Sequence, residues 1–505
     1  MMRSHEHSIS IRSQNENRDV GGEENTSHVD PNAIASTLMS NGNVAPVYKK
    51  LVEKLEDDEA KSQKQGDEDC HDHQELSMVK PKIQRVPAIL RTNKHFEMYY
   101  EPRWISIGPI HHDKPQLQHQ TQYKLVLAAK FIQSSGSGTE VLYSKIKKKF
   151  EELKKCFHED FVKDYDDDTL CWILFFDGCT ALQLINSYVN NNNDELRILK
   201  IKTDQIALAQ QDLFLLENQI PFSILKVLME SCGEKKCEEL KVSVKEFIRY
   251  NVMAPYKYKK SLQIEIDNPE PVHLLELLRS VILQQPEQNR SSCGCPGFRR
   301  TKLDLANDSD QGQQSFRSVQ DLRAAGIDLR PSETCSLRDI TFTSLCFAGW
   351  LRLPPMTVDD TTGPKLLNLI AYEMCPDNIN TDYEVTSYVS FLDSLVDYPS
   401  DVKDLRSSRI LYNLLGCDKD VAQLFNGIAT DLVASPVYMN VISQIQNHYK
   451  SKWRTWMAQV YHDHFSSPWT IVAFLAAVVA LGMSGIQTWT ALKDNPSQPS
   501  SPSPS

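Results

Sequence analysis

The sequence predicts a mainly α-helical fold with a small β-element, in which one large helical domain is followed by a single C-terminal transmembrane helix. Three observations lead to this prediction. Apolar residues recur at three- and four-residue spacing along much of the chain after residue 116. Residues 335–356 alternate or break in the way that suits strands and turns. Residues 465–492 contain no charged side chain and no histidine.

The composition allows a sizeable core and excludes one broad class of partner. The 505 residues are 41% hydrophobic, which is usual for a globular protein. The net charge of −11 argues against a general nucleic-acid binder, because neutralising phosphates requires clustered Lys and Arg. The twelve cysteines form no close, evenly repeated framework, which favours a reducing compartment. Residues 1–25 are polar and lack the apolar core of a signal peptide.

The chain divides into four parts by composition. Residues 1–80 are predicted to be a disordered polar arm, because their few apolar residues cannot offset the entropy of ordering. Residues 81–465 form the main domain, with an exposed insertion at about 285–318 that is low in hydrophobic residues. Residues 466–492 are the predicted transmembrane helix, and residues 493–505 are a short polar tail.

The main domain is expected to begin with extended backbone and to continue with helices. Residues 83–87 and 104–108 are typical of extended segments or short strands between turns. Helical periodicity starts at about residue 117, and a further helix is predicted over residues 141–161.

An unusually apolar helix is predicted from Leu170 to Val189. The acidic residues 166–168 that precede it could form a cation site, but Asp and Thr also cap helix N-termini, where negative charge complements the macrodipole. We favour the capping interpretation. Because Asp177 and Gly178 interrupt the apolar run, this helix is interpreted as a core helix and not as a second membrane span.

The segment 212–222 is predicted to continue a helical stretch that Pro221 bends or ends. Glu217, Asn218 and Gln219 lie just before this break. Their side chains are therefore well placed to satisfy the backbone groups that the break leaves unpaired. Beyond the insertion, strands are expected within 335–342 and 351–356, helices within 366–374, 386–396 and 421–433, and a long amphipathic helix from Pro436 to Val460.

The predicted anchor runs from Trp469 to Leu492. These residues would form a helix roughly 36 Å long, enough to cross a hydrocarbon core with some tilt. Trp469 and Trp489 lie near its ends, where amphipathic rings prefer the membrane interface. A buried helix of a soluble protein and a cleaved lipid-anchor signal are the alternatives. The polar tail that follows the apolar run argues for a retained anchor.

Small residues follow one another at four-residue spacing inside the predicted anchor. Ala476, Ala480 and Ser484 would share one helix face, and such a face lets two helix backbones approach closely. The sequence thus offers a helix-association face for a homo-oligomer. The ordinary composition of a membrane anchor explains the same residues and is the favoured alternative.

We find no catalytic constellation, cofactor motif or metal site in the sequence. His111 and His112 have no carboxylate or cysteine at ligand spacing, so a pair of turn histidines is favoured over a metal site. There is no phosphate-binding glycine loop and no nucleophile elbow. An enzyme with an unrecognised site would have to use His111, His112, Asp177 or Glu217, and it should gather several of them around one pocket.

Several short segments resemble, in order, the signatures of a plant family called domain of unknown function 247. They are Arg85–Pro87, Ile105–His112, Phe176–Cys179, Leu215–Phe222, Leu274–Arg279, Ser318–Gly326, Thr386–Val389 with Phe391, and the C-terminal region from Trp453 through Trp469 into the anchor. The resemblance covers about residues 82–492. Two departures concern turns: Asp113 stands where a glycine is expected, and Ser408–Arg409–Ile410 stands where a Gly–Ile pair is usual.

The resemblance implies a membrane-anchored plant protein of unknown biochemical activity. Some grass members of the family are associated with self-incompatibility, the recognition of self pollen by the stigma. We therefore expect a non-enzymatic interaction or recognition protein whose partners are a membrane and an unidentified protein. An enzyme with an unrecognised active site is the alternative hypothesis.

The charges beside the anchor predict its orientation. Lys450, Lys452 and Arg454 lie within about 20 residues of its N-terminal side, the range over which positive charge sets topology. Beyond the anchor, Lys493 is the single basic residue. The main domain is therefore expected in the cytosol, at the plasma membrane or an endomembrane.

Overall fold

The computed structural model describes residues 81–92, 96–190, 201–285, 318–345, 348–378, 381–429, 432, 436–450 and 468–493. The chain divides into two units, Met1–Met78 and Val79–Ser505, and all described residues belong to the second unit. The predicted arm 1–80 lies outside the described residues. So do nearly all of the predicted insertion at 285–318 and the tail beyond Lys493.

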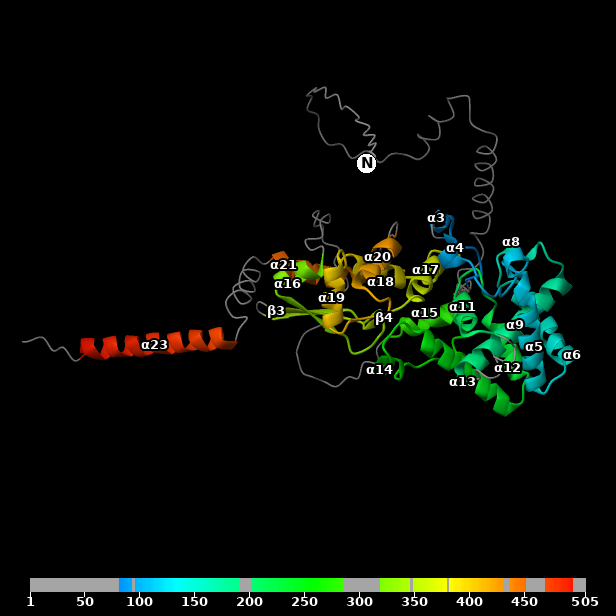
Figure 1. The fold of residues 1–505 in the computed structure, drawn as a ribbon, viewed down its shortest axis with the longest axis horizontal. Helices are drawn as coiled ribbons and strands as arrows, with labels where there is room; N and C mark the ends of the chain where they lie inside the picture. The colour runs from blue at the N-terminus through cyan, green and yellow to red at the C-terminus, as the bar shows by residue number, and fades with distance from the viewer. Residues whose placement is uncertain are drawn as a thin grey trace, which may run out of the picture. The chain divides into compact units, whose positions relative to one another are not determined.

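Within the described residues the fold is mainly helical, as predicted, and its core is continuous from Ile83 to Ile445. The first half of the second unit contains one central helix surrounded by others (Figure 1). The helices of this half are α3 (Ala88–Arg91), α4 (Phe96–Tyr100), η1 (Pro115–Gln120), α5 (Thr121–Ser135), α6 (Thr139–Lys148), α7 (Phe150–Lys154), α8 (Glu159–Val162), α9 (Asp167–Val189), α11 (Thr203–Asp212), α12 (Phe222–Glu230), α13 (Glu234–Asn251), α14 (Tyr256–Lys259) and α15 (Leu274–Ile282).

Helix α9 is the central helix, and its N-terminus is capped as predicted. Asp166 accepts hydrogen bonds from the backbone N–H of Thr169 at 2.9 Å and from its hydroxyl at 2.6 Å. Helices α5, α6, α12 and α13 all contact α9. Gly178 permits the approach of α12, because a Cβ at this position would lie 2.7 Å from the Ile224 side chain. The capping interpretation of the acidic residues is thus confirmed.

Among the described residues, one helix is long and apolar enough to cross a membrane, and it is α9. In its most apolar window, 78% of the helix is buried inside the protein. This burial supports the prediction that α9 is a core helix.

Residues 141–161 were predicted to form one helix, and this prediction is wrong. The structure has three short helices here, α6, α7 and α8. Between α7 and α8 the chain runs alongside residue 83: the N–H of Ile83 donates to the carbonyl of Cys156 at 2.7 Å, and the N–H of His158 donates to the carbonyl of Ile83 at 3.0 Å. This pairing across the fold takes up backbone groups that a continuous helix would use.

The small β-element is confirmed, although its strands differ from the predicted ranges. Strands β1 (Ile327–Pro331), β3 (Ala348–Leu353) and β2 (Thr341–Leu345) form a sheet in that order, with β1 parallel and β2 antiparallel to β3. A second pair joins β4 (Met356–Val358) to β5 (Leu411–Asn413) in parallel. Strands β1 and β5 were not predicted from the sequence.

The second half of the unit packs helices around these sheets (Figure 1). They are α16 (Val319–Ala324), α17 (Thr362–Glu373), α18 (Glu384–Asp393), α19 (Pro399–Ser407), α20 (Asp418–Ile428), η2 (Pro436–Tyr438) and α21 (Met439–Lys450). The start of the predicted amphipathic helix at Pro436 packs on the domain as expected. Tyr438 and Ile445 are buried, and the Tyr438 hydroxyl donates to the carbonyl of Leu337 at 2.9 Å.

The predicted anchor lies in helix α23, Pro468–Lys493. Its continuous apolar stretch, Phe474–Thr490, is shorter than the length needed to cross a membrane. The described side chains of this stretch are all exposed. The structure therefore confirms a helix here, and membrane insertion stays a prediction.

Candidate functional site

The segment between α11 and α12 is not a continuous helix. Its own side chains bind its backbone carbonyls. Helix α11 ends at Asp212, and α12 begins only after Pro221. Asn218 Nδ2 donates to the carbonyl of Asp212 at 2.8 Å, and Gln219 Nε2 donates to the carbonyls of Leu213 and Leu215, both at 2.8 Å. The predicted helical stretch 212–222 is thus wrong. The predicted role in satisfying freed backbone groups is confirmed for Asn218 and Gln219, whereas Glu217 binds the distant Val86 and Arg91.

The same side chains also bind distant segments. The N–H of Val86 donates to Glu217 Oε1 at 2.8 Å, and Arg91 forms an ion pair with the same oxygen. The N–H of Ile107 donates to Asn218 Oδ1 at 2.7 Å, and Asn218 Nδ2 donates to the carbonyl of Ile105 at 3.0 Å. We call Glu217, Asn218 and Gln219 the 217–219 cluster; through these bonds it holds Val86, Ile105 and Ile107 in place.

Asp177 of α9 binds Gly108, the residue that follows Ile107. Its Oδ2 accepts a hydrogen bond from the N–H of Gly108 at 2.8 Å, and its other oxygen pairs with the Lys124 ammonium of α5. Both side chains are buried, since Asp177 is 1% exposed and Lys124 is 10% exposed. A buried carboxylate of this kind is stable because a cation and a backbone amide both bind it.

Asp212 is a buried carboxylate whose role was not predicted from the sequence. It is 1% exposed and accepts hydrogen bonds from three successive backbone amides, those of Arg103, Trp104 and Ile105, at 3.0, 2.7 and 2.8 Å. Burial raises its pKa to about 6, although the three amides act in the opposite direction. The sequence placed Asp212 inside a predicted helical stretch and gave no sign of these contacts.

A second cluster of buried charges lies around Glu373, the last residue of α17, and was also missed. Arg279 donates to Glu373 Oε1 through Nε at 3.0 Å and Nη2 at 2.8 Å. The other oxygen accepts from the N–H of Thr386 at 2.9 Å and from its hydroxyl at 2.7 Å. Nearby, Arg338 makes a bidentate pair with Glu384. No periodicity or motif connects residues so far apart along the chain.

Three of the four residues named for the enzyme hypothesis meet at one turn. His111 Nε2 lies 3.5 Å from Glu217 Oε2, and both side chains are only 4% exposed. Asp177 binds Gly108 in the same turn, whereas His112 faces the Tyr165 ring at 6.3 Å between centroids. Burial and the nearby cations Lys114, Arg85 and Arg91 lower the pKa of His111 to about 3, so its ring is neutral at physiological pH.

A surface cavity of about 330 Å³ lies beside this turn, but none of the four residues lines it. The Tyr165 hydroxyl closes one side, donating to Asp113 Oδ2 at 2.7 Å and to the carbonyl of Pro109 at 3.1 Å. The cavity wall carries both signs of charge. It is lined by Arg85, Pro109, Ile110, Asp113, Lys114, Pro115, Asp160, Phe161, Asp164 and Tyr165.

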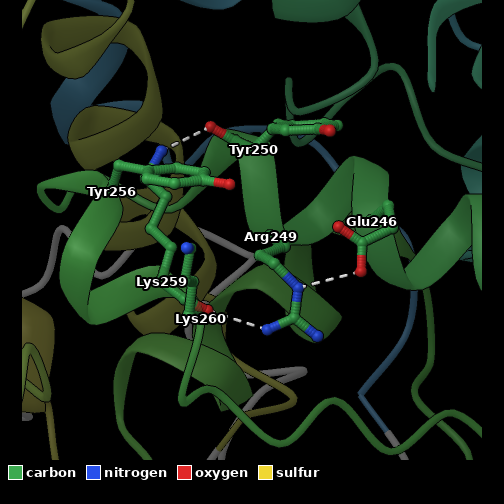
Figure 2. A pocket seen from close by; sticks show the side chains of 6 residues that line it. All are labelled: Glu246, Arg249, Tyr250, Tyr256, Lys259 and Lys260. Atoms are coloured by element: carbon green, nitrogen blue, oxygen red, sulfur yellow. Dashed lines mark hydrogen bonds and ion pairs between the residues drawn. The ribbon is translucent and has the colours of Figure 1, made fainter.

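A second cavity, of about 280 Å³, lies where the end of α13 faces α14 (Figure 2). It is lined by Glu246, Arg249, Tyr250, Tyr256, Lys259 and Lys260. We call it the Tyr250–Tyr256 cavity. Sequence reasoning missed it, because the basic run at 257–260 has no recognised motif.

No group of three or more His, Cys, Asp or Glu side chains that could hold a metal ion occurs within the described residues. In α23, the side chains of Ala476, Ala480 and Ser484 are all exposed. Their role in helix association stays a prediction.

Comparisons with known proteins agree with the resemblance noted in the sequence. The model of DUF247, a family described as plant proteins of unknown function, matches residues 83–483. Two Arabidopsis thaliana proteins, both named UPF0481 proteins, are similar along most of their length. One is 23% identical, with 85% of this chain and 93% of the relative covered, and the other is 26% identical, with 78% and 83% covered. No solved structure matches the chain.

Proposed function

The chain belongs to the DUF247 family of plant proteins of unknown function, and from this premise we propose that it is a membrane-anchored interaction protein without catalytic activity. The proposal has two parts, the anchor and the absence of catalysis. Each part depends on a different set of residues and has its own test.

Helix α23 supports the anchor. Large apolar side chains along it are exposed to an extent that water disfavours: Leu475 is 57% exposed, Leu481 is 73% exposed and Trp489 is 72% exposed. The chain from residue 465 to residue 492 carries no charge. A lipid environment would cover these side chains without any further protein contact. This exposed, uncharged helix is the observation that carries the proposal.

The carboxylates that an enzyme would use support the second part. Glu217, Asp177, Asp212 and Glu373 are each buried and are each bound by backbone amides, and Glu217, Asp177 and Glu373 also pair with a cation. Groups bound in this way stabilise the fold and have little freedom to exchange a proton with a substrate. We therefore assign the four carboxylates a structural role.

The anchor is tested by truncating the chain after Phe465. Membranes from cells that express the full chain or the truncated chain are washed with alkaline carbonate. The full chain should stay with the membranes, and the truncated chain should move to the soluble fraction. Retention of the truncated chain on washed membranes would contradict the anchor.

The interaction role is tested on the full chain purified in mild detergent, with partners identified by mass spectrometry. A protein partner should be recovered in an amount comparable to that of the chain itself. The enzyme alternative has one observation in its favour, the 3.5 Å approach of His111 to Glu217. A turnover that His111→Gln abolishes in a folded variant would replace the present proposal with that alternative.

Recognition of self pollen is the finer role that the resemblance implies, and it belongs to this proposal. If it holds, plants that lack the chain should set seed with their own pollen, whereas plants that carry it should reject that pollen. Unchanged rejection in plants without the chain would remove this role and leave the anchored interaction protein in place.

A further inference from the structure

The Tyr250–Tyr256 cavity has rigid walls. Arg249 Nε donates to Glu246 at 3.0 Å, and Arg249 Nη1 donates to the carbonyl of Lys259 at 2.8 Å (Figure 2). Arg249 Nη1 also donates to the carbonyl of Leu262 at 2.9 Å. Lys259 Nζ donates to the carbonyl of Tyr250 at 2.7 Å, at the end of α13. These bonds fix α14 and the turn after it against α13, so the shape of the cavity is set before any ligand arrives.

The charge of the cavity is positive. Arg249, Lys259 and Lys260 contribute three cations against the single carboxylate of Glu246, which Arg249 already neutralises. The Lys260 side chain is exposed, and its ammonium lies 4.9 Å from the centre of the Tyr256 ring. Burial lowers the pKa of Lys259, which means that its positive charge is poorly solvated. An anion in the cavity would relieve that cost.

The two tyrosines add flat apolar surface beside this charge. Tyr256 is 66% exposed and Tyr250 is 46% exposed, which are large values for aromatic side chains. Exposed Tyr rings bind ligands well because they offer a rigid face together with a polar hydroxyl. The cavity volume of about 280 Å³ is just below the usual range for ligand sites, so it suits one small group.

We infer that the Tyr250–Tyr256 cavity binds a phosphorylated polyol, with the phosphate at Lys260 and Lys259 and the ring of the ligand against Tyr256. Lysine is a common phosphate ligand, acting as a compact point charge. The same chemistry occurs in a phosphoinositide headgroup and in a free inositol phosphate. The inference does not depend on the proposed anchor, since either source presents the same group.

The test uses the full-length chain in a nonionic detergent and isothermal titration calorimetry. The probes are inositol trisphosphate, phosphatidylinositol phosphate dispersed in the same detergent, and phosphatidylcholine as the zwitterionic lipid control without net charge. Saturable binding of either phosphorylated probe, and none of phosphatidylcholine, is expected. The probe that binds more tightly identifies the source of the ligand.

Two variants change the cavity, and one matched variant does not. Lys260→Gln and Tyr256→Ala should each weaken binding by about tenfold, the usual effect of removing one charged or aromatic contact. Lys257→Gln removes the same charge three residues away, from an exposed side chain that lies over Tyr258 and outside the cavity. The affinity of the Lys257→Gln variant for the phosphorylated probes should stay within about twofold of that of the natural chain, as expected for a distant surface charge.

Thermal unfolding of each variant checks that the fold is unchanged. No saturable binding of either phosphorylated probe would overturn the inference. An equal loss of affinity in Lys257→Gln and Lys260→Gln would also overturn it, because general attraction to a basic surface would then explain the binding.

Discussion

Glu217 accepts a hydrogen bond from the backbone N–H of Val86 at 2.8 Å, across 131 residues of sequence. The carboxylate is 3% exposed, and burial raises its pKa, so its charge depends on the amide and on the paired Arg91. Together with Asn218 and Asp177, it binds the backbone of Val86, Ile107 and Gly108, three residues that lie outside the helices. The N–H groups of these residues donate to the three side chains, which therefore take the place of backbone partners.

Glu217→Gln should lower the free energy of unfolding by about 2 kcal/mol, since the change removes one partner of a buried charged pair. The glutamine keeps an acceptor for Val86 but leaves Arg91 without its anion. Thermal or chemical unfolding of the full chain in detergent measures the loss. Lys147→Gln is the matched control: it breaks the exposed pair with Asp168, whose side chains are 57% and 72% exposed. That change should leave the free energy of unfolding nearly unchanged, because exposed ion pairs contribute little. Equal losses in the two variants would contradict the structural role of Glu217.

Gly108→Ala should be among the most damaging single-methyl changes in the domain. Gly108 has a φ of +83°, and a Cβ there would lie 2.5 Å from the backbone oxygen of Gln219. Strain and a clash with rigid backbone together should cost about 3 kcal/mol or more. Gly136 separates the two effects, because its φ is +71° but a Cβ there would meet nothing within 4 Å. Gly136→Ala should cost about 1 kcal/mol in the same unfolding measurement, and a similar cost for both variants would exclude the clash.

Local sequence signals predicted the elements that depend on near neighbours. The cap at Asp166 and the buried helix after it were predicted because the capping residue and the apolar run are adjacent in sequence. The small β-element was predicted, but strand β5 was not. Its three residues are ordered by pairing with β4, more than fifty residues earlier, and a strand this short has no periodicity.

The buried polar groups were predicted only in part, because many of their partners are also distant in the sequence. Glu217, Asn218 and Gln219 were recognised as serving nearby backbone, which Asn218 and Gln219 do. Their other partners, such as Val86 and Ile107, become neighbours only when the chain has folded. Asp212 binds amides more than 100 residues earlier, and Glu373 pairs with Arg279, 94 residues earlier, so their roles could not be predicted from spacing. The Tyr250–Tyr256 cavity likewise depends on the angle between two helices, which the sequence does not specify locally.

Arg409→Gly should stabilise the domain by about 1 kcal/mol. Arg409 has a φ of +60°, a conformation that costs a residue with a side chain about 1–2 kcal/mol and costs glycine little. The position is where the family resemblance led us to expect a Gly–Ile pair. Part of the gain is lost because glycine makes the unfolded chain more flexible. A rise in the melting temperature checks the prediction, and a fall would show that the Arg409 side chain contributes more than its backbone costs.

His273 should make the domain sensitive to acid. Its ring is fully buried at the N-terminus of α15, where Nδ1 accepts a hydrogen bond from the N–H of Glu276 at 3.1 Å. Burial lowers its pKa from 6.5 to about 3. Because the folded pKa is below the unfolded one, the stabilisation is complete above pH 6.5 and is lost as the pH falls towards 3. Between pH 6.5 and about pH 4 this histidine should account for a loss of roughly 3 kcal/mol.

The variant His273→Asn tests this pH dependence. Asparagine is a good N-cap and can accept the same hydrogen bond, but it does not titrate. The variant should be less stable at neutral pH because the smaller side chain leaves a cavity. Its stability should nevertheless fall less steeply than that of the natural chain between pH 6.5 and about pH 4. His111 is present in both proteins, so its titration contributes equally to the two stability profiles. Parallel profiles would show that His273 does not cause the loss of stability in acid.

The last prediction is that the main domain faces the cytosol and the tail after Lys493 faces outward. Three basic residues, Lys450, Lys452 and Arg454, precede α23, and positive charge within about 20 residues of a membrane helix favours the cytosolic side. A recognition role between cells would favour the opposite orientation, so the measurement separates two accounts of the protein. Protease added to sealed vesicles with their cytosolic face outward should digest the main domain. Asn289 and Asn307 each begin a glycosylation sequon, Asn–Arg–Ser and Asn–Asp–Ser. A protected domain, or glycans attached at either asparagine, would place the domain outside the cytosol and would reverse the assignment. A charge-reversed variant with Glu at positions 450, 452 and 454 should lower the digested fraction, because it removes the charges on which the predicted orientation depends.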